Sequence, residues 1–88
     1  MTTNESPLSF PCDFPIKVMG RNEEGLEAAV ASIVERHTAS HERLSVTSRT
    51  SKGGNYISVT VVIRARSKEQ LDTIYRDLTA CEQVLMAL

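Results

Sequence analysis

The stretch KGGNYISVTVVIRA, from Lys52 to Ala65, decides the fold of this chain. In its second part, aliphatic side chains take every other position: Ile57, Val59, Val61, Ile63 and Ala65. This period of two predicts a strand with one buried face, and the many β-branched residues are typical of a central strand. In the first part, two glycines and an asparagine tolerate positive φ, so Thr50 to Asn55 is expected to form a hairpin.

Three further segments are expected to complete a sheet around this strand. Phe14 to Met19 alternates in the same way, which predicts a first strand that Gly20 ends. Arg43 to Arg49 predicts the second strand, with Leu44 and Val46 facing the core. Gln83 to Leu88 is short and apolar and predicts the fourth.

Helical periodicity separates these strands in two places. Asn22 is expected to cap the first helix, whose first turn would hold the carboxylates that a helix dipole favours: Glu23, Glu24 and Glu27. Its buried stripe follows at helical spacing: Leu26, Ala29, Val30, Ile33 and Val34. Arg36 and His37 are expected to end it.

The second helix begins at a capping box, Ser67-Lys68-Glu69-Gln70. Its buried positions are Leu71, Ile74, Tyr75 and Leu78. The resulting order βαββαβ predicts an α+β fold, a ferredoxin-like sandwich in which two helices cover one face of a four-stranded antiparallel sheet. We expect residues 10–88 to form this single domain and residues 1–9 to be a flexible N-terminal segment.

Composition limits the function. Ten basic and eleven acidic residues among 88 give a net charge of −1, which argues against a nucleic-acid binder that depends on a basic excess. Cys12 and Cys81 match no disulfide framework or metal-ligand spacing and are expected to be reduced thiols. No apolar run approaches the roughly 18 residues of a membrane span, and no signal-peptide pattern is present. The expected location is therefore the cytoplasm.

The second face of the predicted sheet is neither fully polar nor a second core. Its side chains are Lys17, Met19, Ser45, Thr47, Arg49, Tyr56, Ser58, Thr60, Val62 and Arg64. Met19 and Val62 are expected to form an apolar centre with one pair from the last strand, either Leu85 with Ala87 or Val84 with Met86. Such a centre with a basic rim is typical of a partner surface. The alternative is that these are isolated exposed apolar residues, which are ordinary on protein surfaces.

The chemistry of other ferredoxin-like proteins is not supported by the first loop. A heavy-metal chaperone needs two cysteines there, whereas this loop reads Met19-Gly20-Arg21-Asn22. An acylphosphatase-like anion site is disfavoured because Glu23 and Glu24 would repel the phosphate. His37 and His41 have no third ligand near them in sequence and are expected to serve as surface or helix-capping residues. We therefore expect a non-enzymatic protein without metal or cofactor.

An RNA-recognition surface would need aromatic side chains on the central strands, and only Tyr56 is present. A weak single-stranded nucleic-acid interface built from Lys17, Arg49, Lys52, Tyr56 and Arg64 is nevertheless kept as the alternative function.

Two family resemblances add to this interpretation. The run from Ile16 through Gly20-Arg21-Asn22 to Gly25-Leu26 resembles the first strand and loop of ACT regulatory domains, although Glu23 and Glu24 depart from the usual pattern. Residues from Phe10 to Leu88 resemble the YbeD-like family of small bacterial proteins. The motifs that carry this second resemblance are Phe10-Pro11, Phe14-Pro15, Lys17-Val18-Met19-Gly20, Arg36-His37, Ser51-Lys52-Gly53, Asn55-Tyr56, Ile74-Tyr75 and Leu78.

The resemblances imply a ferredoxin-type regulatory or adaptor domain with a link to lipoate or amino-acid metabolism. The expected partner is another protein or a second copy of the chain, a small-molecule ligand is kept open, and neither a membrane nor a nucleic acid is the expected partner. The candidate binding residues are Lys17, Met19, Gly20, Arg21, Asn22, Arg49, Tyr56, Val62 and Arg64.

Overall fold

A computed structural model describes residues 9–88, so the segment expected to be flexible lies almost entirely outside the described residues. The elements follow the order β1 (Cys12–Arg21), α1 (Leu26–Arg36), a short 3-10 helix η2 (Ser40–Glu42), β2 (Arg43–Thr50), β3 (Tyr56–Ala65), α2 (Lys68–Ala80) and β4 (Val84–Ala87). Strand β3 has the bounds that its alternation predicts.

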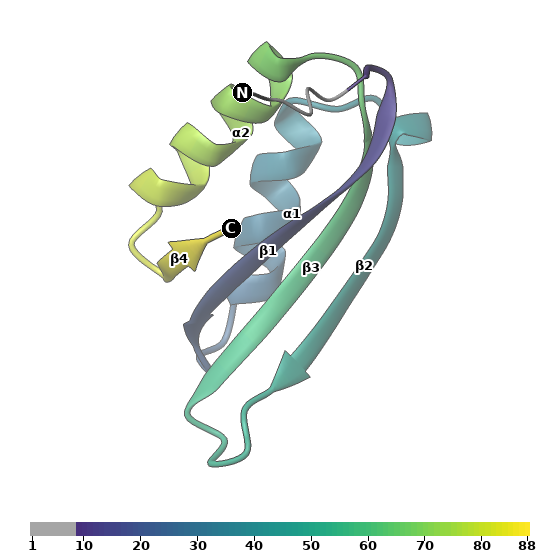
Figure 1. Ribbon diagram of the computed structural model, residues 1–88. Coiled ribbons are helices and arrows are strands. Elements are labelled where there is room, and N and C mark those ends of the chain that lie inside the picture. The colour runs from purple at the N-terminus through teal and green to yellow at the C-terminus, as the bar shows by residue number, and fades with distance from the viewer. Residues whose placement is uncertain (1–8) are drawn as a thin grey trace, which may run out of the picture.

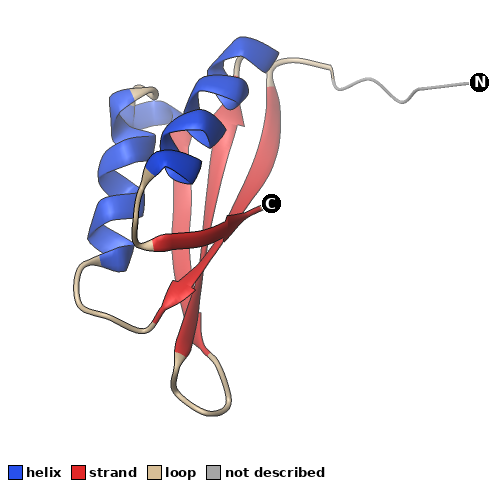
Figure 2. Ribbon diagram, turned by 90° about the vertical axis from the view of Figure 1, so that its left-hand side faces the viewer, coloured by secondary structure: helices blue, strands red, loops and turns tan. Residues whose placement is uncertain are grey.

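The four strands form one sheet in the order β2-β3-β1-β4, and every neighbouring pair is antiparallel. Both helices pack on one face of this sheet, and the opposite face carries no other element of the described chain (Figures 1 and 2). The ferredoxin-like α+β prediction is therefore confirmed. Among residues 9–88, no helix has the length and apolar character needed to cross a membrane.

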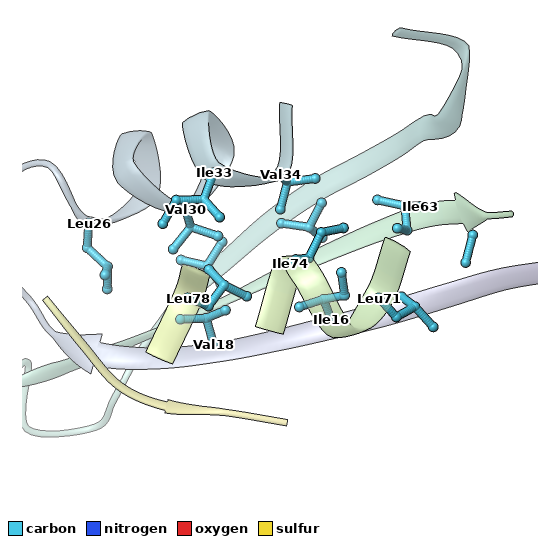
Figure 3. Packing of buried hydrophobic residues seen from close by; sticks show 13 residues of the cluster. Ile16, Val18, Leu26, Val30, Ile33, Val34, Ile63, Leu71, Ile74 and Leu78 are labelled. Carbon is cyan, nitrogen blue, oxygen red and sulfur yellow. The ribbon is translucent and has the colours of Figure 1, made fainter. Parts of the chain in front are cut away.

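The core lies between the sheet and the two helices, as Figure 3 shows. It is formed by the aliphatic positions that the two periodicities predict: Ile16, Val18, Leu26, Val30, Ile33, Val34, Val59, Val61, Ile63, Ala65, Leu71, Ile74 and Leu78. Phe10 and Phe14 pack against one end of this cluster. Each fully buried aliphatic side chain stabilises the fold by about 1.5–3 kcal/mol relative to an exposed one.

Helix α1 begins later than the sequence indicates. Gly20 does not end β1, which continues to Arg21, and Asn22 is not the cap. Gly25 occupies the N-cap position in the left-handed region, with φ 95°, so the chain turns sharply there before Leu26 enters the core. Asn22 instead supports the β2–β3 hairpin, because its Nδ2 donates to the carbonyl oxygen of Gly54 at 2.9 Å.

Strand β2 is more exposed than predicted. Val46 pairs with the buried Val61 and so lies on the helix side of the sheet, but 43% of Val46 and 47% of Leu44 are exposed. Strand β2 is the edge of the sheet, and Leu44 lies in a register irregularity between Arg43 and Ser45, at the end of β2 away from the hairpin. Helix α1 therefore covers only part of this strand.

Strand β4 contains an irregularity that alternation alone does not predict. Met19 pairs with Met86 and Gly20 with Val84, so the register shifts between the two pairs and Leu85 has no partner. Val84 and Ala87 consequently both pack against the core, while Leu85 and Met86 are exposed. Neither of the two predicted apolar pairs is correct, and Met86 and Leu88 join Met19 on the open face.

Candidate functional site: the open face of the sheet

The strand register brings the outward side chains of distant segments into rows across the sheet. One row runs from Met86 through Met19 and Ser58 to Arg49. The next joins Lys17, Thr60 and Thr47, and Arg21 pairs with Tyr56 nearer the hairpin. Because paired residues in an antiparallel sheet point to the same side, these residues share one surface, which we call the open face.

A hollow of about 450 Å³ lies in the middle of the open face. It is lined by Lys17, Val18, Met19, Thr47, Ser48, Arg49, Ser58, Thr60, Met86 and Leu88. The volume lies within the range of about 300–1,000 Å³ that is common for ligand sites. The hollow is therefore large enough to hold a small ligand or a side chain of a partner.

The edge of the hollow depends on the last residues of the chain. The main-chain N–H of Lys17 donates to the oxygen of Leu88 at 3.1 Å, and the N–H of Leu88 donates to the oxygen of Lys17 at 2.7 Å. The hydroxyl of Tyr75 also donates to Leu88 O, at 2.7 Å, and partial burial raises the pKa of this tyrosine. These bonds hold the β4 end beside β1 and place Met86 and Leu88 at the site.

The basic side chains of the open face differ in their pairing. Arg64 donates to Asp13 across the β1–β3 pair, with Nη1 and Oδ1 3.0 Å apart. Within residues 9–88, Lys17, Arg21 and Arg49 form no ion pair. Three cations are thus free to meet an anionic group of a partner.

The structure separates the predicted site residues into groups. Lys17, Met19 and Arg49 line the hollow, whereas Arg21 and Tyr56 lie on the same face toward the hairpin. Val62 and Arg64 belong to the opposite end of the face, nearer the start of β1. The predicted residues on the face are therefore spread along it rather than gathered at one point.

Two predicted site residues do not belong to the face. Gly20 is buried, and a Cβ there would overlap the main-chain oxygen of Gln83 and lie 2.8 Å from Cδ2 of Leu26. Asn22 supports the hairpin through its bond to Gly54. Both residues position the strand ends and do not face the hollow.

Val18, Ser48 and Leu88 line the hollow but were not predicted on this face from the sequence. Met86 was one of two alternatives, because the irregularity in β4 decides which side chain points outward. Leu88 reaches the hollow through its main-chain bonds to Lys17, for which the sequence carries no signal.

The structure contains a second polar cluster, on the helix side. Glu42 is buried and accepts the main-chain N–H of Ala39 at 2.9 Å and Nε of Arg66 at 3.1 Å. These bonds lower the pKa of Glu42. Gln70 is buried beside them and joins this network through its Nε2, which donates to His37 O at 2.9 Å. Every group of the cluster has a partner, so we assign it to stability.

A side-chain hydrogen bond joins helix α1 to helix α2. His37 is the C-cap of α1, and its Nε2 lies 2.6 Å from Oδ2 of Asp77. This bond lowers the pKa of Asp77. His41 is exposed in η2, and no group of three metal-ligating side chains occurs within the described part of the chain.

Comparison with known proteins places the sequence of this chain in a family. The profile of the family described as "Protein of unknown function (DUF493)" matches residues 5–88. A "UPF0250 protein" of Paraburkholderia phytofirmans is 42% identical over 87 residues, which cover 99% of this chain and 98% of that protein. The UPF0250 protein NE1487 of Nitrosomonas europaea is 40% identical over 86 residues, covering 98% and 99%.

Two solved structures share the fold at low identity. The solution structure of protein HP0495 from H. pylori has a TM-score of 0.74 and 13% identity, and the match covers 98% of this chain and 90% of that one. The ACT domain from the GTP pyrophosphokinase of Chlorobium tepidum has a TM-score of 0.67 and 13% identity, with 86% and 84% covered. The resemblance to ACT domains is thereby confirmed for the fold.

Proposed function

We propose that this chain, which belongs to the DUF493 family of YbeD-like bacterial proteins, is a non-enzymatic regulatory or adaptor domain of the cytoplasm that binds a protein through its open face. The observation that carries the proposal is a sheet face that no other element of residues 9–88 covers, with a hollow and three cations that form no ion pair within those residues. An ACT-like fold is compatible with a regulatory role.

The composition of the hollow supports binding rather than catalysis. Thr47, Ser58 and Thr60 present hydroxyl groups, but the lining contributed by residues 9–88 includes no histidine, acidic side chain or cysteine that could act as base or nucleophile. A hydroxyl group without an adjacent base is a weak nucleophile and a good hydrogen-bond donor or acceptor. These side chains are therefore suited to bind and orient a partner through hydrogen bonds.

The hollow also has the size of a small-molecule site, and such a ligand would act on the same face. The resemblance to the YbeD-like family points to lipoate or amino-acid metabolism as the process that the domain regulates. Identification of the partner tests this link.

Site-specific photo-crosslinking in living bacteria tests the proposal. A photoreactive phenylalanine analogue at Thr47 lies in the hollow, and the same analogue at Ala28 lies exposed on the helix side as the matched control. We expect a defined protein adduct at position 47 and none at position 28. Adducts only at position 28, or at neither position, would show that the open face is not the binding surface.

A second candidate function is weak binding of single-stranded nucleic acid, favoured by the pairing of Arg21 with the exposed Tyr56. A base could stack on this ring while the guanidinium meets a phosphate. Fluorescence anisotropy with a single-stranded RNA at low salt, repeated with Tyr56→Ala, tests it. Binding that weakens in the variant supports this function, and no binding rejects it.

A further inference from the structure

Charge is divided between the two sides of the molecule. The open face carries four basic residues, Lys17, Arg21, Arg49 and Arg64, and its one acid, Asp13, is paired with Arg64. Within residues 9–88, the other exposed acids lie on the helices and their connecting loops, at Glu23, Glu24, Glu27, Glu35, Glu69, Asp72 and Glu82, where four exposed basic residues also lie: Arg36, Arg66, Lys68 and Arg76. The face is locally cationic although the chain has a net charge of −1.

The hollow itself has two chemically different sides. Met19, Met86 and Leu88 form an apolar side over β1 and β4, and half of Met86 is exposed. Arg49 lies on β2 at the other end of the same row, with Ser58 between it and Met19. Methionine adapts its shape to apolar groups of different size, so this side suits an aliphatic side chain.

We propose that the occupant of the open face is an acidic segment of a partner protein, in which carboxylates flank an apolar side chain. This inference rests on the proposed function and names its partner by charge complementarity. The apolar side chain sits against Met19 and Met86, and the carboxylates meet Arg49, Lys17 and Arg21. Guanidinium groups bind carboxylates with two parallel hydrogen bonds, which adds specificity to the attraction.

A nucleic acid fits these features less well. The open face has one aromatic side chain, Tyr56, and it lies outside the lining of the hollow, so successive bases would find no stacking platform. The methionine pair next to the cations favours a peptide.

Three labelled peptides separate the contributions of charge and apolar contact. The probe is SSEELEESS, and its controls are SSQQLQQSS, which lacks the charges, and SSEESEESS, which lacks the apolar residue. A single-stranded uridine oligonucleotide of equal length is the fourth ligand. Anisotropy at low salt is expected to show the strongest binding for SSEELEESS, and added salt is expected to weaken it because exposed charges are screened.

Two matched variants locate the binding surface. Arg49→Glu reverses a charge in the hollow, and Arg76→Glu makes the same change on the exposed side of α2. We expect Arg49→Glu to weaken SSEELEESS binding roughly fivefold to tenfold, and Arg76→Glu to change it less than about twofold. Equal weakening by both variants would overturn the assignment to the open face.

The remaining outcomes are also decisive. Absence of SSEELEESS binding, or tighter binding of the oligonucleotide, overturns the acidic-segment proposal. If the photoreactive analogue at position 47 still yields a protein adduct in cells after either of these results, the adaptor function stands and only the nature of the partner segment is wrong. If the analogue at position 47 yields no adduct, the proposed function fails whatever the peptide result.

Discussion

Replacing Gly20 with alanine is expected to destabilise the fold by about 2 kcal/mol, because the new methyl group has no space. The Cβ would overlap the main-chain oxygen of Gln83 and lie 2.8 Å from Cδ2 of Leu26. The oxygen cannot rotate away, so we place the overpacking cost near the upper end of the usual 1–3 kcal/mol, at about 3 kcal/mol. Alanine also restricts the unfolded chain, which offsets about 0.4–1 kcal/mol of this loss.

Urea unfolding followed by circular dichroism measures this change. A loss of about 2 kcal/mol moves the midpoint to lower urea with an unchanged slope, and lowers the melting temperature by about 8–16 °C for a domain of this size. Gly53→Ala is the matched control, since its Cβ would be 3.6 Å from Nδ2 of Asn55, an ordinary contact. We expect this control to be neutral or slightly stabilising.

The result for Gly20 bears directly on the site. A Gly20→Ala protein within about 0.5 kcal/mol of the wild type would refute the packing argument. The assignment of Gly20 to the positioning of the strand ends would then be wrong. Equal losses at both glycines would show that the cost does not come from the contact of residue 20 with Gln83 and Leu26.

Three further predictions concern stability. The pKa of Glu42 is lowered in the fold, so the carboxylate stabilises the protein above the ordinary glutamate pKa, and this stabilisation is lost as pH falls through the folded pKa. Glu42→Gln should therefore lower the free energy of unfolding at pH 7 by about 1–3 kcal/mol and make it depend less on pH in the acid range. An unchanged dependence on pH in that range contradicts this. Ile74→Ala should cost about 2–5 kcal/mol in urea unfolding, whereas Val46→Ala, on the exposed part of β2, should cost less than about 1 kcal/mol; similar losses would place Val46 in the core. Tyr75→Phe removes the bond to Leu88 and should speed hydrogen exchange of the Leu88 amide, and unchanged exchange would show that β4 does not depend on it.

The architecture could be predicted from the sequence because two periodicities are strong. The alternation from Tyr56 to Ala65 and the helical stripe that includes Ile74 describe two surfaces that can only be buried against each other. The N-cap of α2 at Ser67 was also predicted from the sequence, and its Oγ accepts the N–H of Gln70 at 3.1 Å. Local side-chain chemistry specifies each of these features.

The details of the site could not be predicted, because they depend on contacts between distant segments. The unpaired Leu85 decides which β4 side chain faces outward, and it reflects how β4 meets β1 next to the buried Gly20. Arg21 was expected in a loop, but β1 continues past Gly20 and brings Arg21 onto the open face opposite Tyr56. The exposure of Val46 follows from the position of β2 at the edge of the sheet, which the composition of β2 does not reveal.

The central claim, that the open face is the binding surface, is tested most directly by methyl NMR of the protein titrated with the partner that photo-crosslinking captures. The ε-methyl groups of Met19 and Met86 report on the hollow, and the methyl groups of Ala28 and Ala80 report on the exposed helices. We predict that the two methionine signals shift or broaden while both alanine signals stay in place. Shifts at Ala28 and Ala80 with unchanged Met19 and Met86 would contradict the account.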